Sequence, residues 1–254
     1  MAIHILSILL EAEAEPPREI VWNRKYDEKF SNLLITNNRL SDVLSKISYK
    51  AAMAIASVLT ELVQQWSSKK YFPHIDIVKE FPQKINSLWT GAIDPLYLKT
   101  FRFDWEYFDE NGDTVTYTAN WYIVRHLTKE YTESSFTIHR YLINLSMLAR
   151  HLTPNKKLFD QWFTETMRKT AEVFPCTYDY ADLDFNDKEA RYDCSVDAPV
   201  PREFFFDPEF EYSEETAKPV LNAFLQSLDY NNNPWLCTPE EMLGKGFKGT
   251  PYEV

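Results

Sequence analysis

Glycine is the residue whose scarcity most constrains how this chain folds. The 254 residues contain five glycines, against about 18 expected from an average usage of about 7%. None of the five lies between Gly112 and Gly244. Such a low glycine content points to a mostly helical protein. The same gap excludes glycine-rich phosphate loops, dinucleotide fingerprints and nucleophile elbows from this span.

Apolar residues recur with helical periodicity along much of the chain. The strongest pattern runs from Leu40 to Trp66, where apolar residues return every three or four positions. It predicts a central helix, capped by Asn38 or Ser41, whose alanines allow a neighbouring element to approach closely. Further helices are predicted over residues 120–131, 134–152 and 156–173. Another is predicted over residues 75–90, where Pro82 should kink or split it.

Two shorter patterns complete the predicted fold. Alternating runs on both sides of Asn111-Gly112 predict a small β-hairpin at about residues 101–119. Ser213 and Thr238 are expected to cap the last two helices. The fold class is therefore mainly α, with a bundle-like set of helices in a single domain over residues 1–254. A helical body at about 1–173 carries the hairpin, and an acidic, aromatic segment and a C-terminal helix follow at 174–254.

Negative charge is concentrated in a long irregular segment at about residues 174–212. From 174 to 215 the chain holds thirteen acidic residues and three basic ones, so this stretch carries ten of the chain's eleven net negative charges. Ten aromatic residues lie in the same stretch. Aromatic anchors beside carboxylates are typical of a surface that recognises a basic partner. The alternative is an ordinary surface whose rings fold inward while the acids stay in water. The predicted partner-binding residues are Tyr178, Asp179, Asp182, Asp184, Asp187, Tyr192, Asp193, Glu203, Asp207, Glu209 and Glu211.

Part of this segment resembles a calcium-binding loop in its spacing of oxygen ligands. Positions one, three, five and twelve of that template correspond to Asp182, Asp184, Asn186 and Asp193. Position six is Asp187, where the sharp turn requires glycine, and position twelve is an aspartate instead of the longer glutamate. These are weak metal candidates, and we expect no bound metal and no cofactor.

The remaining chemistry excludes several classes of function. The net charge of −11 argues against binding to nucleic acid or to anionic membranes. No stretch approaches the length of about 20 apolar residues that spans a bilayer. Three cysteines without metal-ligand spacing fit a reducing, cytoplasmic location. No serine or cysteine lies in a recognisable catalytic context.

Three functions are therefore open, and the first is favoured. It is a non-enzymatic interaction protein that binds a basic protein, most concretely an immunity or antitoxin-type inhibitor of a bacterial toxin. The second is a metal-dependent hydrolase that uses the carboxylates between Asp179 and Asp193. The third is a structural or phage-type assembly protein. Neither the partner nor the oligomeric state follows from the sequence.

Overall fold

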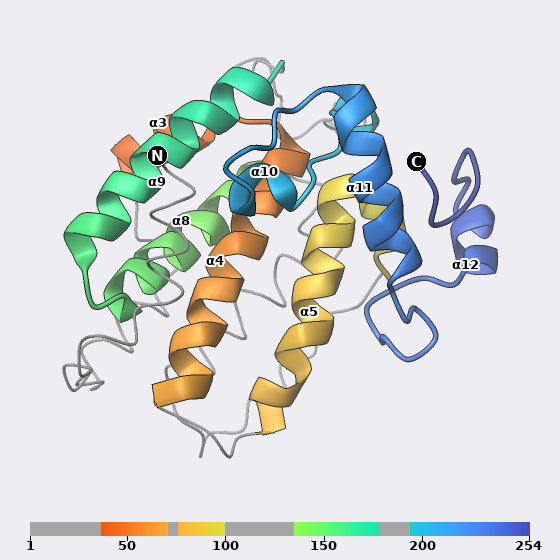
Figure 1. Cartoon of the computed structure of the whole chain (residues 1–254), viewed down its shortest axis with the longest axis horizontal. Helices are drawn as coiled ribbons and strands as arrows, with labels where there is room; N and C mark the ends of the chain where they lie inside the picture. The colour runs from red at the N-terminus through yellow and green to blue at the C-terminus, as the bar shows by residue number, and fades with distance from the viewer. Residues whose placement is uncertain (1–36, 71–75, 100–134, 178–193) are drawn as a thin grey trace.

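The structure is a computed structural model, and it describes residues 37–70, 76–99, 135–177 and 194–254. These residues are mainly helical, as predicted (Figure 1). The predicted hairpin at about 101–119, the predicted helix at 120–131 and the N-terminal residues lie outside this part of the chain. Within the described residues, β-pairing is limited to two isolated antiparallel bridges, Ile47 with Pro175 and Leu98 with Leu236.

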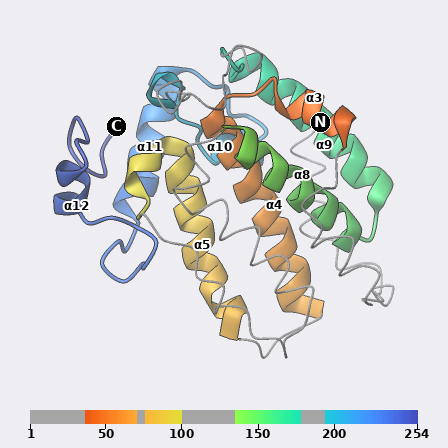
Figure 2. The same cartoon turned by 180° about the vertical axis from the view of Figure 1, so that it is seen from behind.

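Helix α4 (Tyr49–Lys70) is the central element, as its apolar periodicity predicted. It contacts both α5 (Asp76–Ile93) and α8 (Ser135–Leu152). In Figures 1 and 2, α5 lies on one side of α4, and α9 (Lys156–Val173) lies on the other. The side chains of α4 that its neighbours cover are fully buried, namely those of Ala51, Ala52, Ala54, Ala56, Val58, Leu59 and Leu62.

The predicted continuous helix from Leu40 to Trp66 is wrong at its beginning, because the structure breaks it into α3 (Asn38–Leu44) and α4. The backbone between the two helices pairs with the chain that follows α9. Ser48 N donates to Phe174 O at 3.0 Å, and Cys176 N donates to Lys46 O at 2.9 Å. This long-range pairing replaces the intrahelical hydrogen bonds. The capping residue also differs from the prediction, since the side chain of Asn37 accepts from Leu40 N at 3.1 Å.

Helix α5 runs without a split through Pro82. A proline inside a helix removes one backbone donor, and packing against α4 compensates for that loss. The next turn is a 3₁₀ helix, η1 (Pro95–Tyr97), which Asp94 caps. Helices α8 and α9 have almost the predicted bounds. The short η4 (Cys194–Val196) begins the last described part of the chain.

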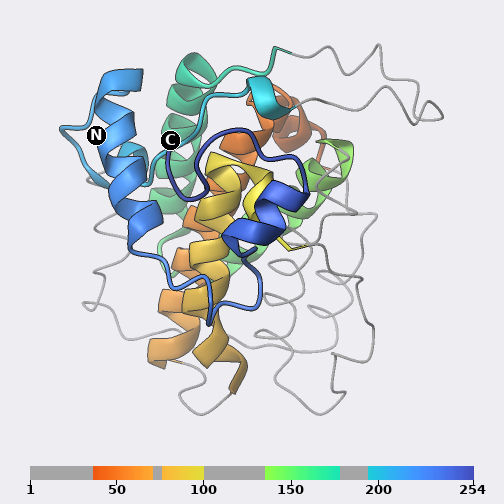
Figure 3. The same cartoon turned by 90° about the vertical axis from the view of Figure 1, so that its right-hand side faces the viewer.

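The C-terminal part contains three further helices, α10 (Glu203–Phe206), α11 (Glu214–Gln226) and α12 (Pro239–Gly244). Ser213 and Thr238 cap α11 and α12 as predicted, and each forms a reciprocal capping box. Figure 3 shows α12 and the chain end in front of α5. This placement follows from hydrogen bonds on both sides of Leu98, because Lys99 N donates to Trp235 O at 2.9 Å and Cys237 N donates to Tyr97 O at 2.8 Å.

Candidate functional site

Four of the predicted partner-binding residues fall within the described structure, namely Glu203, Asp207, Glu209 and Glu211. The other predicted residues lie outside it: Tyr178, Asp179, Asp182, Asp184, Asp187, Tyr192 and Asp193, together with the weak metal candidate Asn186. The carboxylates of the alternative hydrolase belong to this second group. The structure therefore describes residues 174–177 and 194–212 of the acidic segment, which include its C-terminal half, and the site is built from there.

Buried aromatic rings attach this part of the chain to the helical body. Phe204 and Phe205 of α10 are 2% and 3% exposed. The ring of Phe204 lies 5.0 Å from that of Phe174, and the ring of Phe205 lies 5.9 Å from that of Trp89 on α5. The first pair is edge-to-face and the second is tilted, and aromatic pairs at these distances add to the burial of apolar area. These rings form part of the core, so they are unavailable to a partner.

A second attachment is polar and joins α10 to α4. Arg202 donates to both carboxylate oxygens of Glu61, from Nε at 3.0 Å and from Nη2 at 2.7 Å. Trp89 Nε1 donates to the same carboxylate at 2.7 Å. The Arg202 guanidinium also lies 3.9 Å from the centre of the Phe206 ring. One of the three basic residues of the acidic segment is thus engaged by an acid of the helical body.

Another acid of the segment is structural. Asp197 is 8% exposed and lies at the N-terminus of α4. Its carboxylate accepts from Lys50 N at 3.3 Å, while its backbone oxygen accepts from Lys50 Nζ at 2.9 Å. A carboxylate near a helix N-terminus is stabilised by the free N–H groups and by the helix dipole. Asp197 therefore contributes to the fold and is distinct from the exposed acids that follow it.

The chain from Glu209 to Ser213 alternates between exposed polar residues and inward rings. Glu209, Glu211 and Ser213 are exposed, whereas Phe210 and Tyr212 between them are half-buried. An extended chain directs successive side chains to opposite faces, which accounts for the alternation. The Tyr212 ring lies 4.5 Å from Phe174, and its hydroxyl donates to Pro199 O at 3.3 Å. Burial and the nearby Glu214 raise the pKa of this hydroxyl.

The result is an uncompensated negative surface, which we call the acidic run. It consists of Glu203, Asp207, Glu209, Glu211, Glu214 and Glu215, and no basic residue occurs between residues 203 and 217. Within the described structure, none of these six carboxylates forms an ion pair, while Arg202 is engaged by Glu61. Asp207 also accepts from Glu209 N at 2.9 Å, which orders the turn. An ordered backbone therefore carries these residues, of which Glu203 is half-buried and the other five are exposed.

The structure also contains a cavity that the sequence did not predict. About 830 Å³ lies between α3, α8 and α9. Its lining combines apolar side chains, such as Phe159 and Met167, with charged ones, and Arg150 is held by Asp160 in a bidentate pair at 2.6 and 2.8 Å. The only sequence signal is the spacing of Phe159, Phe163 and Met167 along α9, which is equally typical of a core face. The packing of α3 across these residues creates the cavity.

Other site chemistry is limited in this part of the chain. No group of three or more His, Cys, Asp or Glu side chains able to hold a metal occurs among the described residues. None of the described helices has both the length and the apolarity to cross a membrane. Comparison with protein-family models, curated proteins and solved structures found no match to this chain. The chemistry of its own surface is therefore the basis for assigning a function.

Proposed function

We propose that this chain is a non-enzymatic interaction protein that binds a basic protein partner through the acidic run. The observation that supports this most directly is the absence of any ion pair to the six carboxylates among the described residues, although Arg202 adjoins them in the sequence. Like charges held on one ordered surface repel each other, and a basic partner relieves this repulsion.

The arrangement suits fast and selective association. Exposed carboxylates attract a basic surface over about one Debye length, which is about 8 Å at physiological salt. Such steering raises association rates and disfavours acidic competitors. The half-buried rings of Phe206, Phe210 and Tyr212 lie among the carboxylates. Their exposed edges offer apolar contact once a partner is close.

The most concrete form of this proposal is an immunity or antitoxin-type inhibitor in the cytoplasm. A toxin that acts on nucleic acid carries a basic surface complementary to phosphate. An ordered row of carboxylates competes for that surface without being cleaved. The acids between Asp179 and Asp193 belong to the same charged segment, and in this proposal they extend the binding surface beyond the acidic run.

The test compares two variants that remove the same charge from different places. The first carries Asp207→Asn, Glu209→Gln and Glu211→Gln within the acidic run. The second carries Asp42→Asn, Glu240→Gln and Glu253→Gln, which are exposed acids on α3, on α12 and at the chain end. Each variant and the wild type serve as bait for proteins of the source cell, with elution by increasing salt. The captured protein is then titrated against all three baits by calorimetry.

We expect the wild type and the second variant to retain the same basic protein. The first variant should bind it at least about tenfold more weakly, equivalent to about 1.4 kcal/mol, and with a smaller dependence on salt. Equal affinity of both variants would refute a role for the acidic run. The same role would also be refuted if the captured protein were acidic and its binding did not weaken with added salt.

A further inference from the structure

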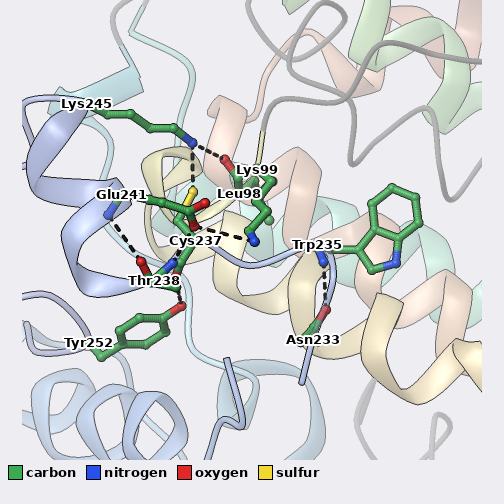
Figure 4. A network of polar contacts seen from close by, with 9 residues as sticks. All are labelled: Leu98, Lys99, Asn233, Trp235, Cys237, Thr238, Glu241, Lys245 and Tyr252. Carbon is green, nitrogen blue, oxygen red and sulfur yellow. Dashed lines mark hydrogen bonds and ion pairs between the residues drawn. The ribbon is translucent and has the colours of Figure 1, made fainter. Parts of the chain in front are cut away.

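The C-terminal part of the chain places a thiol and an amine in direct contact. Lys245 Nζ lies 2.7 Å from Cys237 Sγ and 2.9 Å from Leu98 O (Figure 4). Hydrogen bonds from nitrogen to oxygen span about 2.7–3.2 Å, and sulfur is a larger atom than oxygen. A nitrogen–sulfur separation of 2.7 Å is therefore shorter than an ordinary hydrogen bond to sulfur. It is close to the separation of two atoms joined through a single bridging atom.

The surrounding hydrogen bonds hold both partners in place. Cys237 N donates to Tyr97 O at 2.8 Å, and Tyr252 Oη donates to Cys237 O at 2.6 Å. Lys245 directly follows α12, and its backbone N–H donates to the backbone oxygen of Glu241 at 3.1 Å. The Glu241 carboxylate points elsewhere, accepting from Thr238 N at 2.7 Å and pairing with Lys99 at 3.5 Å. Figure 4 shows that the Lys245 side chain extends so that its nitrogen lies beside the Cys237 sulfur and the Leu98 oxygen.

We propose that Cys237 and Lys245 form a reversible covalent bridge, in which one oxygen atom joins Sγ to Nζ, when the protein meets a hydroperoxide. Cys237 is a free thiol, so it is available for oxidation. Its side chain is 1% exposed, and the oxidant reaches it through local opening of the short C-terminal elements. The bridge fastens α12 to the segment that pairs with Leu98. It involves no residue of the acidic run, so it is independent of the proposed function.

The reaction consumes one hydroperoxide in each of two steps. In the first, oxygen is transferred to Cys237 as the O–O bond breaks, giving a sulfenic acid and one water. In the second, the Lys245 ammonium group first releases a proton to solvent. The resulting amine and the sulfenic acid then each lose one hydrogen as the N–O bond forms. The second hydrogen peroxide accepts these two hydrogens with their electrons and leaves as two waters. In total, the thiol, the amine and two molecules of hydrogen peroxide give the bridge and three waters.

The test uses the full chain with Cys176→Ser and Cys194→Ser, so that Cys237 is its only thiol. The protein is treated with hydrogen peroxide, digested with trypsin without reductant, and analysed by mass spectrometry. We expect the peptide that contains Cys237 and Lys245 to gain one oxygen and lose two hydrogens. Trypsin should no longer cleave after Lys245. Excess dithiothreitol should restore both the original mass and the cleavage.

Two lysine substitutions separate the bridge from other oxidations. Lys245→Arg keeps the positive charge and should abolish the bridged peptide, whereas Lys248→Arg on the exposed tail should leave its yield unchanged. Circular dichroism establishes that both variants are folded. Oxidation of Met242 in the same peptide adds oxygen without loss of hydrogen, so its mass differs from that of the bridge.

Three results would overturn the proposal. One is a Cys237 that carries two or three oxygens while trypsin still cleaves after Lys245. Another is loss of two hydrogens with no gain of oxygen, which indicates a direct S–N bond. The third is an unmodified Cys237 under conditions that oxidise Met242. Each is read from the same digest of the parent protein, so the conclusion does not depend on the folding of either lysine variant.

Discussion

At the scale of single residues, the Glu61 carboxylate shows how one partly buried acid joins distant segments. It accepts from Trp89 on α5 and from Arg202 before α10. Its side chain is 15% exposed and that of Arg202 is 45% exposed, whereas Trp89 is buried at 2%. The Arg168–Glu165 pair on α9 differs, because both side chains are largely in solvent and belong to one helical turn. We therefore expect the Glu61 cluster to contribute more to the stability of the fold than the Arg168–Glu165 pair does.

The first prediction compares the loss of Glu61 with the loss of Glu165. Glu61→Ala should lower the free energy of unfolding by about 1–3 kcal/mol, because it leaves the Trp89 indole N–H and the Arg202 guanidinium without their acceptor. The matched change Glu165→Ala should cost at most about 1 kcal/mol, since exposed pairs contribute little. Urea denaturation of both variants measures the difference. Equal losses would show that the Glu61 cluster has no special structural role.

The second prediction follows from Tyr252, whose hydroxyl donates to Cys237 O. Burial, followed by the effect of Cys237 and neighbouring groups, raises the pKa of this hydroxyl in the folded protein. A raised folded pKa gives stability that is fully present below the unfolded pKa of about 10 and is lost as pH rises through the folded value. Tyr252→Phe should therefore be less stable than wild type at neutral pH, with a difference that shrinks above about pH 10.

Unfolding in urea at a series of pH values checks this prediction. Tyr97 also has a raised pKa because of burial and the nearby Asp94, so the Tyr252→Phe variant should keep part of the alkaline loss of stability. A constant difference between wild type and variant across the alkaline range would contradict the assignment.

At the scale of elements, Gly91 of α5 lies where this helix packs against α4 and against Leu98. A Cβ atom at Gly91 would lie 2.9 Å from both Met53 Cε and Leu98 Cδ1. These are the ends of flexible side chains, so a single added methyl displaces them slightly, while a branched side chain requires the two helices to move apart. Gly244 provides the comparison, because nothing lies within 4 Å of a Cβ at that position of α12.

The third prediction uses valine at both glycines. Gly91→Val should lower the free energy of unfolding by about 1–3 kcal/mol through overpacking. Gly244→Val should change it by less than about 0.5 kcal/mol, as for most surface substitutions. Thermal denaturation followed by circular dichroism measures both. A loss at Gly244 as large as that at Gly91 would show that the contacts with Met53 and Leu98 do not set the effect.

At the scale of the whole molecule, the net charge of −11 is unevenly placed. The described carboxylates of the acidic run form no ion pair, so their mutual repulsion acts against the compact state. Salt screens this repulsion and should stabilise the folded protein. The fold tolerates the repulsion because the rings of the same segment, including Phe204 and Phe205, are buried beneath the charges.

The fourth prediction concerns the variant with Asp207→Asn, Glu209→Gln and Glu211→Gln. No ion pair is lost, so its free energy of unfolding should be equal to or above that of the wild type. Added potassium chloride should stabilise it less than it stabilises the wild type. A large loss of stability at physiological salt would mean that these carboxylates hold the fold together and are not a free surface.

Much of the helical arrangement was predictable because it depends on local patterns. The bounds of α8 and α9 follow from apolar spacing and from Pro154 and Pro175, which end them. The caps at Ser213 and Thr238 follow from neighbouring residues alone. The predicted partner-binding site stays a prediction. Charge content indicated the acidic segment but could not distinguish the buried Asp197 from the exposed Glu209 and Glu211.

The sequence by itself determined the helical class, the central helix and the place where negative charge accumulates. These properties depend on residues close together in the chain, whose spacing and charge are fixed before folding. Only the tertiary structure decided the break before α4, the engagement of Arg202 by Glu61, and the contact of Lys245 with Cys237 beside Leu98. Each of these joins atoms from separate segments, and their proximity results from packing that no local pattern encodes.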